Sequence, residues 1–286
     1  WYNWAITVAF ELVAVQFIMK FWFPDIPGVW WSAIFLAIIF CINALTVKGF
    51  GESEFLFSLV KVIAIIFFIV IGLFMIGKIM LDPTQSVLKN WTIGEAPFVG
   101  GFQALVGVAM IAGFSFQGTE MVGVAAGESK DPKKTIPIAI KQIFWRILLF
   151  YILCIFIIGT LVAYTDPSLK LAAEGDGNIM LSPFTLLYEK AGLAFAAGLM
   201  NAVILTAIMS AGNSGMYSST RMLFDMARQG RAPKWFAKLD MRGVPMNALY
   251  ATTAIAALCF FTTLFGENEV FTWLLNMSGM CGFIVW

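Results

Sequence analysis

The chain has 286 residues, of which 60% are hydrophobic and 12% are charged, with 18 Lys and Arg against 17 Asp and Glu. A soluble domain carries about 25% charged residues. The charges are clustered and leave long apolar runs, each reaching the roughly 18 residues that cross about 30 Å of hydrocarbon. Composition therefore argues against a large soluble helical protein and predicts a polytopic membrane protein.

Eight apolar runs are expected to cross the membrane as helices, because backbone groups in hydrocarbon must satisfy their own hydrogen bonds. The predicted fold class is therefore all-α. The sequence begins without Met and ends inside an apolar run, so we expect residues 1–286 to be part of a longer chain truncated at both ends. The runs cover residues 2–23, 29–46, 55–80, 99–126, 143–163, 191–216, 247–265 and 270–286.

Basic residues are concentrated in the loops 47–54, 127–146 and 217–246, which lie on one side of the predicted membrane. The positive-inside rule places these loops in the cytoplasm of a multi-pass protein of the inner (plasma) membrane. We interpret them as topology signals and lipid contacts and not as a nucleic-acid site.

The chain has no His, and its four Cys all fall in apolar runs without a CxxC pair. This pattern predicts no metal site, no cofactor and no catalytic residues, and it argues against a membrane-embedded enzyme. Any proton transfer must therefore use carboxylates or Lys.

Three ionisable residues lie inside apolar runs: Glu11, Lys61 and Glu120. Charges at membrane depth are costly and usually face a substrate or proton pathway, although a structural ion pair or a snorkelling side chain is the alternative. Glu11 shares a helix face with Trp4, so both face either one cavity or an interhelical contact.

The fourth run contains Gly113 and Gly118 around polar and aromatic residues in mid-span. This arrangement predicts two half-helices with a break near residues 115–118, as in secondary transporters, against an intact glycine-rich packing helix. A second small-residue patch contains Ser210 and Asn213, which either allows close helix packing or lines a pathway.

The segment 113–151 resembles the amino acid permease family of the amino acid/polyamine/organocation superfamily. The residues that carry the resemblance are FQGTE at 116–120 and DPKKTIP at 131–137. NWTIGEAPF (90–98), SAGNSGMYSSTRML (210–223) and GVPMNALYATT (243–253) are similar to the bacterial lysine-specific permease branch.

The resemblance implies a twelve-helix protein with two inverted five-helix repeats, of which this chain covers about helices three to ten. It places Phe114 at an aromatic gate and turns the carbonyls around Phe114, Ser115 and Gln117 toward the substrate ammonium. Lys61 matches the fifth-helix Lys of proton-coupled relatives. We expect its ammonium to form hydrogen bonds with groups of the first and eighth helices in one state of the transporter. We also expect Lys61 to change its protonation during transport. The substrate carboxylate would be held by the first helix.

These observations predict a secondary active transporter that imports lysine or another basic amino acid with protons by alternating access. Its partners would be the amino acid, protons and membrane lipid, without nucleic acid; the sequence makes no prediction of oligomeric state. The alternatives are a permease for neutral amino acids, an amino acid exchanger, and a channel or receptor.

For Glu120 two roles are open, contact with the substrate side chain or a gating, proton or structural role. The predicted substrate-binding residues are Trp4, Phe114, Ser115, Phe116, Gln117, Gly118 and Glu120; those for proton coupling are Lys61 and Glu120; those of the pathway are Glu11, Ser210 and Asn213.

Overall fold

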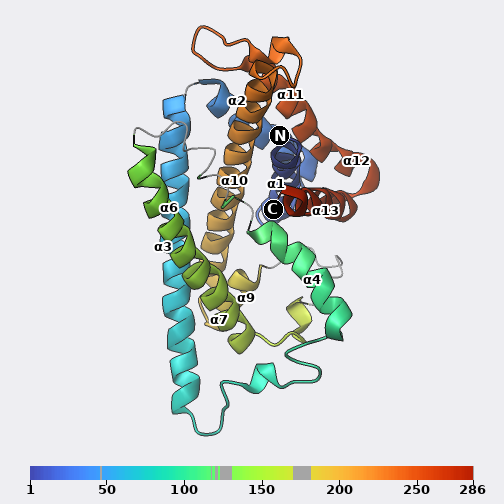
Figure 1. The fold of residues 1–286 in the computed structure, drawn as a ribbon. Helices are drawn as coiled ribbons and strands as arrows, with labels where there is room; N and C mark the ends of the chain where they lie inside the picture. The colour runs from blue at the N-terminus through green and yellow to red at the C-terminus, as the bar shows by residue number, and fades with distance from the viewer. Residues whose placement is uncertain (46, 117, 120–121, 123–130, 170–181, 286) are drawn as a thin grey trace. The chain divides into compact units, whose positions relative to one another are not determined.

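The computed structural model describes residues 1–45, 47–116, 118–119, 122, 131–169 and 182–285, with only the backbone described at 47–53, 110–111, 114, 194–197, 283 and 285. Every regular element among these residues is helical (Figure 1). In chain order the elements are α1 (Tyr2–Lys20), α2 (Gly28–Leu45), α3 (Val47–Leu81), η1 (Lys89–Trp91), α4 (Gly101–Ser115), α6 (Pro132–Arg146), η2 (Ile147–Leu153), α7 (Cys154–Leu161), α9 (Pro183–Lys190), α10 (Ala194–Arg228), η3 (Lys234–Ala237), α11 (Met246–Ala256), η4 (Ala257–Phe261), α12 (Thr262–Phe265) and α13 (Glu267–Val285).

Six helical stretches of the described chain are long and apolar enough to cross a membrane. The expected runs 99–126 and 270–286 are not among them, the first because α4 ends at Ser115 after 15 residues. The six stretches are Tyr2–Lys20, Gly28–Leu45, Glu54–Leu81, Pro132–Leu161, Gly198–Arg228 and Met246–Phe265.

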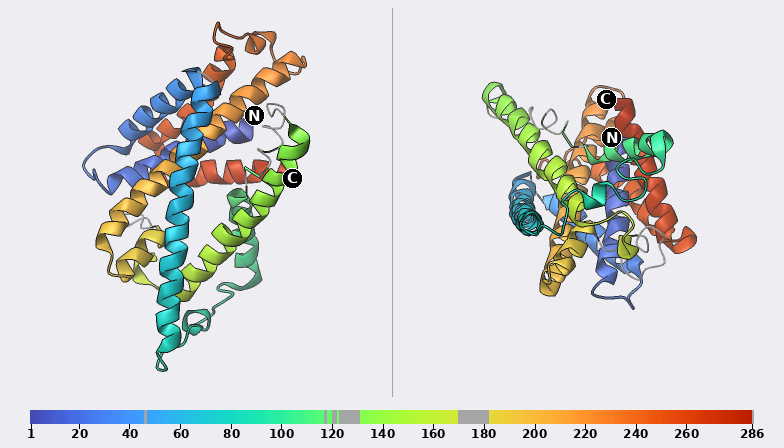
Figure 2. Two further views of the ribbon diagram at one scale, coloured as in Figure 1. Left: turned by 90° about the vertical axis from the view of Figure 1, so that its left-hand side faces the viewer. Right: turned by 90° about the horizontal axis from the view of Figure 1, so that it is seen from below.

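The chain forms two compact units: Trp1–Lys61 with Val203–Trp286, and Val62–Ala202. The boundaries fall inside α3 and α10, each of which is one continuous helix in the views of Figure 2.

The first unit is built around α1, which packs against α2, α11 and α13. Most of α1 is buried, from Trp4 to Met19. A helix that is apolar on all sides is expected in such a central position. The buried residues of α2 are Gly28, Ser32, Leu36 and Ile39, whose spacing of four, four and three places them on one face.

The second unit has an aromatic core in which Phe68 of α3 is fully buried. Its ring lies 4.6 Å from that of Phe184 and 6.1 Å from that of Tyr188, measured between centroids. Both partners belong to α9, which begins where the Ser182 hydroxyl accepts a hydrogen bond from the backbone N–H of Phe184. An N-cap Ser followed by Pro is a strong helix start, and it fixes α9 against α3.

Helices α6 and α10, like α3, extend beyond the apolar runs that predicted them. Helix α6 begins at Pro132, eleven residues before residue 143, and continues through the π-helical η2 into α7. Helix α10 ends at Arg228, twelve residues after residue 216. Leu223 and Ala227 in this extension are buried and lie on the same helix face as the buried Met216. The extension is therefore stabilised by packing of one apolar face and does not need a continuous apolar run.

Candidate functional site

The fourth apolar run is interrupted where the sequence predicted a break. Helix α4 ends at Ser115, and the backbone N–H of Phe116 bonds to the carbonyl of Gly113, three residues earlier, at 3.2 Å. Gly118 has φ +94°, which an L-residue with a side chain rarely adopts. The predicted end of the first half-helix is therefore confirmed, whereas the second half falls largely outside the described residues.

Three of the residues predicted to contact substrate in this run have no described side chain. Gln117 and Glu120 lie outside the described residues, and only the backbone of Phe114 is described. Ser115 is exposed at the helix end. The described backbone places Ser115 at the end of α4 and Phe116 in the turn that follows.

The Phe116 ring has a partner that sequence reasoning missed. It stacks on Tyr151 of η2, with centroids 5.5 Å apart and planes 17° from parallel. Residue 151 was part of the segment that carried the family resemblance, yet nothing in its spacing from Phe116 signals the contact. This stack fixes one side of the interrupted segment to the π-helical turn.

Lys61 lies in a polar cluster within the first unit. Its Nζ donates a hydrogen bond to Ser210 Oγ at 2.6 Å, and the Ser210 hydroxyl donates in turn to Glu54 Oε1. Lys61 Nζ and Glu54 Oε1 are 3.9 Å apart, and these two side chains are 27% and 25% exposed. Lys61 also interacts electrostatically with Glu11 of α1. The structure thus joins three residues predicted separately, Lys61, Ser210 and Glu11, and adds Glu54.

Glu54 was missed because the sequence placed it in a loop. Helix α3 starts at Val47, so Glu54 is already helical and lies seven residues, or two turns, before Lys61. This spacing was the available signal, because residues seven apart share a helix face. The contact of Lys61 with α10 agrees with the expected eighth-helix partner.

Trp4 and Glu11 both face α10, at two glycines one turn apart. A Cβ atom added at Gly215 would lie 3.3 Å from the Trp4 carbonyl oxygen, and one at Gly212 would lie 3.8 Å from Glu11 Cβ. Trp4 is only 7% exposed. The small residues therefore let α1 and α10 approach closely, which is the interhelical contact that the sequence left open for Trp4.

Asn213 connects α10 to α2. Its Oδ1 accepts a hydrogen bond of 2.9 Å from Asn43 Nδ2, and the residue is fully buried. Its own Nδ2 has no partner in the described part of the chain. Asn213 lies three residues after Ser210, so the two predicted pathway residues occupy one side of α10.

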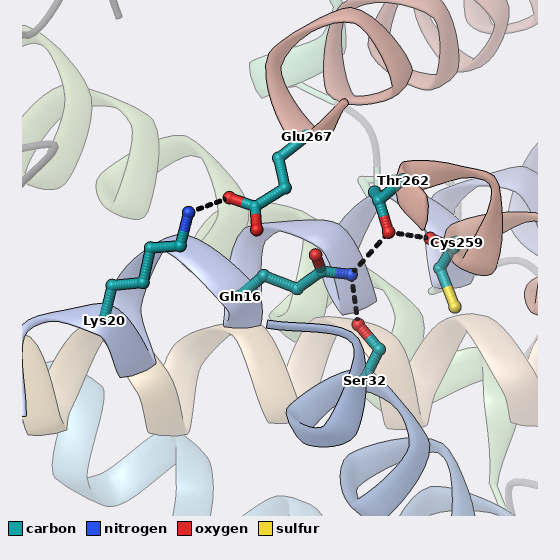
Figure 3. Close-up of polar contacts among 6 residues, drawn as sticks. All are labelled: Gln16, Lys20, Ser32, Cys259, Thr262 and Glu267. Carbon is teal, nitrogen blue, oxygen red and sulfur yellow. Dashed lines mark hydrogen bonds and ion pairs between the residues drawn. The ribbon is translucent and has the colours of Figure 1, made fainter. Parts of the chain in front are cut away.

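A second polar cluster of the first unit joins α1 to α2, α12 and α13 (Figure 3). Gln16 Nε2 donates to Ser32 Oγ at 2.6 Å and to Thr262 Oγ1 at 3.3 Å, and Lys20 forms an ion pair with Glu267. The sequence did not predict this cluster, because its members are dispersed over 250 residues. Gln16 is fully buried, and a buried amide without hydrogen bonds is costly. The bonds to Ser32 and Thr262 therefore stabilise this side chain.

One cavity, of about 640 Å³, lies in the second unit between the end of α3 and the α9–α10 turn. It is lined by Phe74, Lys78, Asp82 and Lys190 among others, and by none of the predicted site residues. Lys190 Nζ lies 2.5 Å from Asp166 Oδ2, and this hydrogen bond holds the pKa of Asp166 below its ordinary value.

Helices of membrane-spanning length, together with one interrupted apolar helix and a Lys–carboxylate cluster, define a multi-pass helical membrane protein. The amino acid permease family model matches residues 1–286, so the chain belongs to the amino acid permease family.

Named relatives align with the whole of this chain. It is 60% identical over 286 residues to the lysine-specific permease LysP of Escherichia coli (strain K12) and 48% identical over 292 residues to LysP of Lactococcus lactis subsp. cremoris (strain MG1363). It is 45% identical over 286 residues to the histidine permease HisP of the same Lactococcus strain. The chain spans 58%, 56% and 59% of the lengths of these relatives.

Proposed function

We propose that this protein is a secondary active transporter that imports lysine together with protons by alternating access. The observation that carries the proposal is the 60% identity to a lysine-specific permease over the full 286 residues. Family membership supports transport of an amino acid, and the two LysP relatives support lysine as the substrate.

Proton coupling is proposed for Lys61. A Lys amine can lose its proton in a dry environment, whereas an Arg stays charged. Lys61 is three-quarters buried, and its ammonium is held by the Ser210 hydroxyl at 2.6 Å beside two carboxyl groups. A change in water access at this cluster would alter the balance between the charged and the neutral amine, which is what coupling requires.

Substrate recognition is proposed at the interruption of α4. Helix α4 ends at Ser115, and the last carbonyls of a helix lack intrahelical donors, so carbonyls near this end are the proposed acceptors for the substrate α-ammonium. The side-chain ammonium of lysine needs a separate acceptor, because an unpaired charge is costly to bury. Glu120 is a candidate acceptor, and a gating, proton or structural role is the other role proposed for it.

The HisP relative supports a second candidate substrate, histidine, at 45% identity. Competition separates the candidates: a lysine transporter shows labelled lysine uptake that unlabelled lysine suppresses at lower concentration than histidine does. The reverse order would assign the site to histidine.

The test of the proposed function uses the full-length protein in proteoliposomes. Labelled lysine uptake should saturate with concentration and should increase when the outside is made acidic relative to the lumen. Collapse of the proton gradient with a protonophore should abolish accumulation against the lysine gradient. Flux that rises linearly with lysine concentration would indicate a channel, and uptake indifferent to the proton gradient would contradict coupling.

Glu120→Gln separates the two roles of Glu120. Direct contact with the lysine side chain predicts lost lysine affinity with neutral amino acids spared or gained. A gating or proton role predicts a loss for every substrate. Unchanged lysine transport would reject both roles.

A further inference from the structure

Glu54 and Lys61 lie two turns apart on the same face of α3. At 1.5 Å per residue, seven residues separate their Cα atoms by about 10 Å along the helix axis. The side chains close this distance, so that Nζ and Oε1 are 3.9 Å apart. Glu54 is the member nearer the N-terminal end of α3, where the basic residues predict the cytoplasmic surface.

The hydroxyl of Ser210 connects the two groups through hydrogen bonds. Lys61 Nζ donates to Ser210 Oγ at 2.6 Å, and Ser210 Oγ donates to Glu54 Oε1. A Ser hydroxyl accepts and donates at the same time, so the atoms form an unbroken N–H···O–H···O chain. Such a chain can move a proton without moving a side chain.

We propose that Glu54 accepts the proton that Lys61 releases toward the cytoplasm, with Ser210 as the relay. The inference rests on the proposed proton-coupled transport and identifies its inward release route. In the step, an N–H bond of Lys61 breaks as an O–H bond forms at Ser210 Oγ, while the former Ser210 O–H bond breaks as one forms at Glu54 Oε1. A neutral amine, an intact hydroxyl and a protonated carboxyl result, and the net charge of the cluster is unchanged.

The burial of the cluster favours this transfer when water is excluded. In bulk water the proton stays on an amine, whose reference pKa is about six units above that of a Glu carboxyl. Removing water penalises both charges and so favours the neutral pair. Both side chains are about three-quarters buried, and Glu54 Oε2 is buried without a hydrogen-bond partner in the described part of the chain.

The carboxyl groups facing Lys61 include Glu11 of α1 as well as Glu54 of its own helix. The described contact of Glu11 with Lys61 is electrostatic and acts through space, whereas Glu54 is joined to it through the Ser210 hydroxyl. Glu54 therefore provides the hydrogen-bonded path by which the proton leaves.

Two assays of the full-length protein in proteoliposomes test the relay. The first is uphill lysine uptake driven by a pH gradient, which needs net proton release at every cycle. The second is lysine counterflow at equal pH, in which the loaded carrier returns without releasing its proton. Glu54→Gln should lower driven uptake roughly tenfold or more while counterflow stays within about twofold of wild type. Ser210→Ala should behave similarly, and Ser210→Thr, which retains a hydroxyl, should restore driven uptake.

Asp225→Asn on the exposed cytoplasmic extension of α10 is the matched control, since it removes one carboxylate away from Lys61. The relay would be overturned if Glu54→Gln retained driven uptake. It would also be overturned if a folded Glu54→Gln variant lost counterflow as well as driven uptake. If Glu54→Gln does not fold, the contrast between Ser210→Ala and Ser210→Thr makes the same test, and equal behaviour of the two would overturn it. A wild-type protein without gradient-driven uptake would instead refute the proposed function.

Discussion

Gly28 is a position where adding one methyl group should be poorly tolerated. A Cβ atom placed there would lie 2.8 Å from Gln16 Cβ and 2.9 Å from both Gln16 Oε1 and Glu267 Oε1. Carbon atoms in favourable contact are about 3.5–4.0 Å apart, so the substitution Gly28→Ala creates an overlap on three sides. Gln16 Cβ is attached directly to the backbone of α1 and cannot rotate away.

The magnitude follows from what must move. Overpacking a filled site costs about 1–3 kcal/mol. Displacing Gln16 or Glu267 would also disturb the hydrogen bonds and the ion pair drawn in Figure 3, at about 1 kcal/mol for each bond lost. We therefore expect Gly28→Ala to destabilise the full-length protein by about 2–4 kcal/mol.

Gly77→Ala is the matched control, because a Cβ added at Gly77 inside α3 meets no heavy atom within 4 Å. There the same substitution should stabilise by about 0.4–1 kcal/mol through helix propensity and a less flexible unfolded chain. The measurement is the thermal midpoint of the purified protein in one detergent. A Gly28→Ala midpoint equal to or above that of Gly77→Ala would refute the packing argument.

Three further predictions concern other sites. Lys61→Ala should abolish the pH dependence of lysine uptake, and uptake with the wild-type pH profile would exclude Lys61 from coupling. Gly215→Leu should lower the thermal midpoint, with a cost of about 2 kcal/mol or more, because its side chain would collide with α1 where the Cβ alone comes within 3.3 Å of the Trp4 carbonyl. The low pKa of Asp166 contributes stability that is present above its unfolded pKa and lost as pH falls through the folded value, so Lys190→Met should flatten the fall of the thermal midpoint below about pH 4. An unchanged acid profile would contradict that assignment.

Hydrophobicity located the membrane-spanning elements but not their ends. The run beginning at residue 55 became a helix that starts at Val47, and the run ending at residue 216 became one that ends at Arg228. Apolar runs report the hydrocarbon thickness, whereas a helix continues wherever backbone hydrogen bonds and an amphipathic face support it. This difference hid Glu54, which appeared to be a loop residue.

The sequence could propose a site residue where that residue differed in charge or polarity from the apolar residues around it. Lys61 is a charge in an apolar run, and Gly113 and Gly118 bracket polar residues in mid-span, so local composition was sufficient. The positions of the side chains at Gln117 and Glu120 stay predictions.

The sequence by itself indicated the class of protein, six of the membrane-spanning runs and the family resemblance, and it singled out Lys61 as the proposed coupling residue. The tertiary structure determined the partners: Ser210 and Glu54 around Lys61, Tyr151 under Phe116, and the Gln16 cluster between four helices. Insertion of a segment into the membrane follows from its own composition, because hydrocarbon selects each apolar run separately. A contact between helices is chosen by how the helices pack, which depends on many side chains at once and leaves no periodic signal in the chain.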